Sequence, residues 1–199
     1  MRRRTTVVAG VALATILTLA TGSVLAFANG GDGSSSGPKL RAEAVIEGAP
    51  GSGIFGKVTF VQDGATEDQP TPAIRVQARV EGLTPGLHGF HLHEIGACAP
   101  PYTAAGGHYD PGPFGNSNPD ANHPYHMGDV PNLVADESGV GRLHAVTTRV
   151  TLSPGPTTLF DANGSAVIVH LNPDQGITGP AGSGVSGGPR VACGVIVMD

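Results

Sequence analysis

Histidines are the residues of this chain whose type and spacing could do chemistry, and there are eight of them. His91 and His93 are separated by one residue within a run typical of a β-strand. Side chains two apart on a strand project from the same face, about 7 Å apart at Cα, so both imidazoles could converge on one metal ion. His88 has the opposite parity, and we expect it to point toward the core as a buried, hydrogen-bonded imidazole.

A second group of candidate ligands follows in one long connection. His108 stands in GGHYDP, and the segment HPYHMGD supplies His123, His126 and Asp129. Three imidazoles and a carboxylate satisfy the tetrahedral preference of zinc. The alternative is a loop of solvated polar residues, which is disfavoured because five of the eight histidines fall within 36 residues.

Three further residues border a second long connection. His170 ends the apolar run AVIVH, Asp174 follows four residues later, and Arg190 closes the connection in GGPRVACGVI. A histidine at the end of a strand serves either as a ligand or as a structural residue, and its position alone favours neither. His144 lies on an alternating run without a partner in sequence, and we expect it to be a surface or structural residue.

The elements that must position these residues are short β-strands. Gly (31 residues) and Pro (17 residues) make up about a quarter of the 199 residues, and both break helices. Segments of alternating polarity or β-branched residues bounded by turn residues predict eight strands, at 42–47, 54–62, 74–82, 88–93, 133–135, 141–148, 165–170 and 190–198. This pattern predicts an all-β, eight-stranded barrel or sandwich with two long functional loops, at 94–132 and 171–189.

The first 38 residues differ in composition from the rest. Three arginines, an apolar run from residue 7 to 20 and the sequence AFA at 26–28 are typical of a secretory signal peptide at 1–28. The alternative is an uncleaved membrane anchor, since about 20 apolar residues can span a bilayer. Residues 29–38 (NGGDGSSSGP) have the composition of a flexible linker, so we expect one folded domain at 39–199. A cleaved signal predicts an exported protein, either secreted or held in the periplasm or cell envelope, with no stable membrane partner.

Charge and cysteine content restrict the partners and the compartment. The formal net charge is −5 and no basic run follows residue 4, so we expect no nucleic-acid partner. Export would place Cys98 and Cys193, the two cysteines, where disulfides persist, and we expect them to pair. Free thiols or soft metal ligands are the alternative. Nothing in the sequence indicates the oligomeric state.

Four motifs resemble, in the same order, those of the copper/zinc superoxide dismutase family. They are HGFHLHEIG at 88–96, AGGHYDP at 105–111, HMGDVPNL at 126–133 and GGPRVACGVI at 187–196. The resemblance spans about 42–198 and implies a Greek-key β-barrel whose long loops hold copper and zinc. It also implies the reaction 2 O2•− + 2 H+ → O2 + H2O2, with superoxide anion as substrate.

The resemblance implies a role for each matching residue. The copper ligands would be His91, His93, His108 and His170. His108 would also bridge to zinc, whose further ligands would include His126 and Asp129. His108 and Arg190 would act in catalysis, Asp174 would link ligands of the two metals from outside, and Cys98 and Cys193 would form the family disulfide.

Two features depart from the family pattern. The middle zinc histidine usually lies about halfway between the positions of His108 and His126, but residues 111–122 contain no histidine. His123 is the candidate replacement; otherwise it is a solvated loop residue, and zinc binds weakly or not at all. The second loop has no charged residue from 175 to 189, so Arg190 is its only cation.

Two other functions compete with dismutation. A secreted copper-binding or storage module would use the same ligands, but it has no need of an arginine that docks an anion. A zinc hydrolase could use Glu94 as general base, yet such enzymes typically hold zinc by three protein ligands and a water. We therefore expect an oxidoreductase of the copper/zinc superoxide dismutase type.

Overall fold

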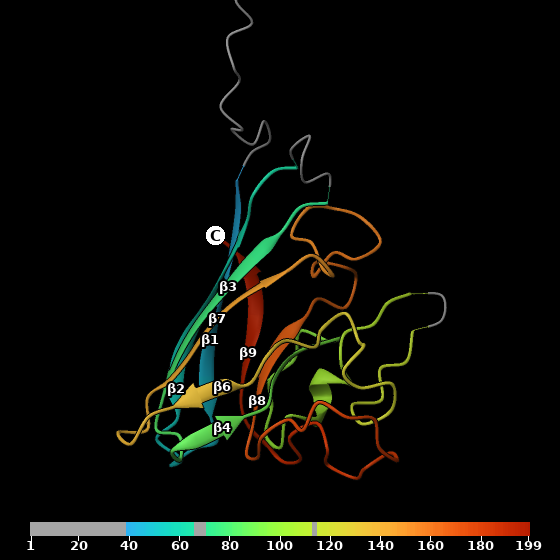
Figure 1. Cartoon of the computed structure of the whole chain (residues 1–199). Helices are drawn as coiled ribbons and strands as arrows, with labels where there is room; N and C mark the ends of the chain where they lie inside the picture. Colours follow the sequence, from blue (N-terminus) through green and yellow to red (C-terminus); the bar gives the residue numbers. More distant parts are fainter. Residues whose placement is uncertain (1–38, 66–70, 113–114) are drawn as a thin grey trace, which may run out of the picture. The chain divides into compact units, whose positions relative to one another are not determined.

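The computed structural model describes residues 39–65, 71–112 and 115–199 (Figure 1). The predicted signal peptide at 1–28 and linker at 29–38 lie outside the described residues. In the described part of the chain, no helix has the length and apolar character needed to cross a membrane.

Within these ranges the chain forms one antiparallel sheet. Its strands are β1 (Leu40–Gly48), β2 (Phe55–Gln62), β3 (Ile74–Glu81), β4 (Gly86–His88), β5 (Phe90–His93), β6 (Leu133–Ala135), β7 (Gly141–Thr147), β8 (Ala166–His170) and β9 (Arg190–Met198), and a short 3-10 helix, η1, spans Thr103–Ala105. The strand order is β4-β6-β7-β3-β2-β1-β9-β8-β5. Because its first and last strands, β4 and β5, are consecutive in the chain, the sheet curls into a nearly closed barrel. The predicted all-β barrel is thus confirmed.

The alternation of side chains explains which face of the sheet is covered. On β3, Ile74, Val76 and Val80 are fully buried, whereas Arg75 and Arg79 between them are exposed. Burying an aliphatic or aromatic side chain of this size contributes about 1.5–3 kcal/mol. The barrel interior therefore supplies the stability that lets the loops outside it carry polar groups.

One predicted element is wrong in its bounds: the strand expected at 88–93 is two strands. Gly89 separates β4, which pairs with β6, from β5, which pairs with β8. A Cβ at Gly89 would lie 2.9 Å from the Ser186 carbonyl oxygen and 3.2 Å from His170 Cβ. Glycine thus permits the second long loop to approach the backbone where the chain changes neighbours.

The parity argument holds on both sides of this break. His88 is buried, and its Nδ1 lies 2.8 Å from the carbonyl oxygen of His170. This confirms the expected buried, hydrogen-bonded imidazole. His144 is exposed on β7, in agreement with the expected surface position.

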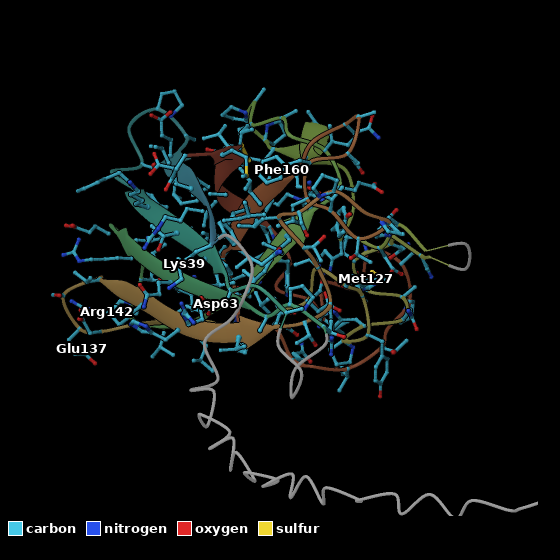
Figure 2. All side chains as sticks on the ribbon, turned by 90° about the horizontal axis from the view of Figure 1, so that it is seen from above. Lys39, Asp63, Met127, Glu137, Arg142 and Phe160 are labelled. Carbon is cyan, nitrogen blue, oxygen red and sulfur yellow. A yellow bond between two sulfur atoms is a disulfide. The ribbon has the colours of Figure 1, made fainter. Side chains whose placement is uncertain are left out.

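Both long loops lie next to each other outside the barrel (Figure 1). Thr178 Oγ1 donates to the carbonyl of His123 at 2.6 Å, and the N–H of Gly179 donates to the carbonyl of Asp120 at 2.8 Å. A disulfide joins Cys98 to Cys193, which confirms the predicted pairing and ties the start of the first loop to β9. Figure 2 shows Met127, from the first loop, on the side of the molecule away from Glu137 and Arg142.

Candidate metal centre

Four buried imidazoles converge beside β5 and β8. His91 and His93 come from β5, His170 ends β8, and His108 comes from the first long loop. An isolated antiparallel bridge between His93 and His108 holds the loop against the strand. Each imidazole offers a nitrogen, and these ligand atoms all lie within 4.8 Å of one another.

Hydrogen bonds occupy one nitrogen of each ring. His93 Nδ1 lies 3.1 Å from the carbonyl of Gly106, and His170 Nδ1 lies 2.9 Å from the carbonyl of Gly188. His91 and His108 use carboxylates instead, as described below. The opposite nitrogens are His91 Nδ1, His93 Nε2, His108 Nε2 and His170 Nε2. They are buried and have no hydrogen-bond partner among the described residues.

These four unpartnered nitrogens test whether a metal ion fits between the imidazoles. A buried polar group without a partner costs about 1–3 kcal/mol, so four at one point call for a common partner. Burial lowers the pKa of His93 and His170 well below its ordinary value, and burial together with the neighbouring His91 lowers the pKa of His108 to about 3. These imidazoles are therefore neutral, the form that binds a metal. Four imidazole nitrogens suit Cu(II).

Asp129 is the centre of a second group. Its carboxylate lies 2.6 Å from Nδ1 of His108, 3.2 Å from Nδ1 of His123 and 2.9 Å from Nδ1 of His126. Burial alone would raise the pKa of Asp129, but the three imidazoles outweigh it and hold the pKa far below its ordinary value. Three nitrogens and a carboxylate facing one another are the donor set that zinc prefers.

His91 also lies near this second group. Ligand atoms of His91, His108, His123 and Asp129 all fall within 4.8 Å of one another. His126 is not in this group of four, although its Nδ1 lies 2.9 Å from the Asp129 carboxylate. His91 Nδ1 is buried and has no hydrogen-bond partner among the described residues.

Asp174, on the second loop, connects the two groups. Its carboxylate accepts from His123 Nε2 at 2.7 Å and lies 3.0 Å from His91 Nε2. Burial lowers the pKa of His123, but Asp129 and Asp174 outweigh it and raise that pKa to about 9. His123 is thus held between two carboxylates, and it is fully buried rather than solvated.

Arg190 lies on the wall of a cavity beside the first group. Its guanidinium donates to the carbonyl oxygens of Tyr102 at 2.7 Å and of Gly106 at 2.6 Å, which fix its orientation. Arg190 and His170 line the same cavity of about 670 Å³, together with polar residues of both loops. A small anion therefore has a path to His170 beside a fixed cation.

Comparison with known proteins identifies the family to which this geometry belongs. The family model described as copper/zinc superoxide dismutase (SODC) matches residues 54–196. The chain belongs to the copper/zinc superoxide dismutase family. It is 40% identical to the Superoxide dismutase [Cu-Zn] of Deinococcus radiodurans over 170 residues, which cover 79% of this chain and 84% of that protein.

Two further members of the copper/zinc superoxide dismutase family are similar. Superoxide dismutase [Cu-Zn] 2 of Aquifex aeolicus is 33% identical over 79% of this chain and 86% of its own length. Superoxide dismutase [Cu-Zn] of Caulobacter vibrioides is 40% identical over 62% of this chain and 71% of its own length.

The sequence motifs did not indicate the residues that hold the loop around His123. Arg149 donates to the carbonyl oxygens of Pro124 at 3.2 Å and His126 at 3.0 Å, while Thr178 donates to that of His123. Asp120 was missed as well. All of them act largely on backbone groups, which every sequence offers, so no motif marks them.

Proposed function

We propose that residues 39–199 form a domain that disproportionates superoxide at a copper ion held by His91, His93, His108 and His170. The supporting observation is that each imidazole has one buried nitrogen without a hydrogen-bond partner among the described residues, and that ligand atoms of all four lie within 4.8 Å of one another. A copper ion bound by these residues would supply one-electron exchange between Cu(II) and Cu(I). The overall reaction is 2 O2•− + 2 H+ → O2 + H2O2.

His108 is the residue that couples this centre to a proton. Its Nε2 faces the copper group, and its Nδ1 faces Asp129. With its proton lost, His108 could offer Nε2 to copper and Nδ1 to zinc. His108 Nε2 is also the atom that would hold a proton for transfer to peroxide.

Arg190 is proposed to dock the substrate. The chain carries a formal net charge of −5, so its overall field repels an anion, and a local positive potential must override that field. The guanidinium is a fixed fork of donors on the wall of the cavity that also reaches His170. Since residues 175–189 contain no charge, no other cation of that loop guides the anion.

We propose His108, His123, His126 and Asp129 as the zinc ligands. His123 would replace the histidine that family members place earlier in the loop. The burial of His123 and the distance of 3.2 Å from its Nδ1 to the Asp129 carboxylate support this assignment. Zinc has no redox chemistry, so its part would be to fix His108 and the loop.

Export is proposed from the signal-like segment at 1–28, and the disulfide supports it because such bonds persist in oxidising compartments. The domain would then act in the periplasm, at the cell envelope or outside the cell.

Metal analysis of the purified 39–199 domain, paired with a superoxide-decay assay, tests the function. We expect copper and zinc in equal amounts and a decay rate that depends on copper. His144→Ala is the control, since this exposed histidine lies on β7 outside both groups. Bound copper without accelerated decay would favour the copper-storage alternative.

A further inference from the structure

Asp120 is a buried carboxylate that belongs to neither metal group. It is 4% exposed and lies in the first long loop. One oxygen accepts the N–H of Gly184 at 3.0 Å, and the other accepts the N–H of Ser186 at 3.1 Å and its Oγ–H at 2.9 Å. The main-chain carbonyl of Asp120 accepts the N–H of Gly179 at 2.8 Å. One residue of the first loop thus binds the second loop at three positions.

The second loop has few other means of holding its shape. Residues 175–189 contain no charged side chain and six glycines, of which Gly184 has a φ of +75°. Its remaining anchors are mostly backbone bonds, such as Gln175 N–H to the Val185 carbonyl at 2.8 Å. Asp120 is therefore a charged anchor supplied from the first loop to a segment, 175–189, that has no charged side chain of its own.

The anchored segment leads directly to two functional side chains. Two residues after Ser186, the carbonyl of Gly188 pairs with His170 Nδ1. That bond fixes the ring of His170 and leaves Nε2 free for the metal. Arg190 follows two residues later. Gly187, between Ser186 and Gly188, packs so closely against His170 that a Cβ at Gly187 would lie 2.7 Å from His170 Cβ.

We propose that Asp120 is a positioning residue, which orients His170 through Ser186 and Gly188 and sets where Arg190 docks an anion. The proposal rests on the function proposed above for His170 and Arg190. It assigns Asp120 no contact with metal or substrate. Asp120 lines the cavity, but its carboxylate already accepts three hydrogen bonds from Gly184 and Ser186.

A matched variant separates this role from a general loss of a carboxylate anchor. Asp136, in the β6–β7 turn, accepts the N–H and Oγ–H of Ser138 and the N–H of Val140, the same kinds of donors that Asp120 has. Unlike Asp120 it is exposed and also pairs with Arg142 at 2.8 Å. It lies beside Glu137 in the turn that Figure 2 shows away from Met127. The test therefore compares Asp120→Ala and Asp120→Asn with Asp136→Ala.

Each protein is loaded with copper and zinc, and azide is titrated as a small anion while the Cu(II) absorption and electron paramagnetic resonance spectra are recorded. For Asp120→Ala we expect azide to bind about tenfold more weakly and the Cu(II) spectrum to change. About tenfold is the smaller end of the losses usually seen when a residue that orients a metal ligand is replaced. Asp120→Asn keeps one oxygen for Ser186 and should show a smaller change. Asp136→Ala should match the wild type.

Wild-type spectra and azide affinity in a fully loaded Asp120→Ala protein would overturn the proposal. Tighter azide binding would also overturn it, because that result assigns Asp120 a repulsive charge instead. If Asp120→Ala fails to fold, amide hydrogen exchange in the wild type provides the test: Gly184 and Ser186 must exchange more slowly than exposed Ile177 of the same loop, and faster in Asp120→Asn. Absence of dismutation in the wild type would refute the proposed function alone, since these comparisons need no turnover.

Discussion

Replacing Gly128 with alanine should weaken zinc binding while it leaves the copper ligands of β5 in place. Gly128 lies in the HMGD turn between His126 and Asp129, and it packs on β5 at Leu92. A Cβ at Gly128 would lie 2.3 Å from the carbonyl oxygen of Leu92 and 3.1 Å from Tyr109 Cβ. Backbone carbonyls of a paired strand cannot move aside, so the turn must withdraw by about 1 Å to reach ordinary contact distance.

The cost follows from the contacts that this movement breaks. Leu92 N–H donates to the Gly128 carbonyl at 3.0 Å, and Gly128 N–H donates to the Tyr109 carbonyl at 2.8 Å. At about 0.5–1.5 kcal/mol for each hydrogen bond, we expect the free energy of unfolding to fall by about 1–3 kcal/mol. Because Asp129 moves with the turn, zinc affinity should fall by about 10–100-fold, whereas β5 keeps His91 and His93 in place for copper.

Denaturant unfolding of the metal-free protein and competition for zinc with a chelator measure these two effects. Gly112→Ala, in the same loop, is the control, because among the described residues the nearest atom to a Cβ there is Gly115 N at 3.9 Å. Unchanged zinc affinity and stability in Gly128→Ala would refute the reasoning, since they would mean that the turn does not need this close approach.

Three other predictions concern the site and its frame. His91→Ala should abolish dismutation and leave the fold intact, because the barrel core does not include the metal; wild-type activity in a correctly metallated variant would contradict the copper assignment. Arg190→Glu should retain copper by metal analysis but slow superoxide decay at low ionic strength, where an unchanged rate would exclude Arg190 from the mechanism. Replacing Cys98 and Cys193 with serine removes a disulfide that spans 95 residues of sequence. The free energy of unfolding, measured by denaturant titration, should fall by up to roughly 4–5 kcal/mol. Equal stability of the reduced and oxidised proteins would contradict this prediction.

Local pattern predicted the parts of the site that depend on local geometry. The period-two rule places His91 and His93 on one face and His88 on the other, whatever the rest of the chain does. The all-β architecture followed in the same way from strand-length runs between turn residues. Spacing alone could not show that the strand breaks at Gly89, because the break depends on the approach of Ser186 from the second loop and of His170 from β8.

Long-range contacts determine the remainder of the site. His123 lies three residues from His126 in sequence, yet its placement depends on Asp174 and Thr178, which reach it from the second loop. The same holds for Asp120, whose partners are 64 and 66 residues away.

The two loops therefore form one functional unit even though β6, β7 and β8 separate them in sequence. Asp174 joins His91 to His123, so displacement of the second loop would disturb both metal groups together. Asp120 makes the reverse connection, since it lies in the first loop and holds the second loop in place. Segment 175–189, which has no charged side chain, is held by carboxylates on either side of the site: Asp174 bonds Gly176, and Asp120 bonds Gly184 and Ser186. This leaves Arg190 as the cation that an incoming anion meets.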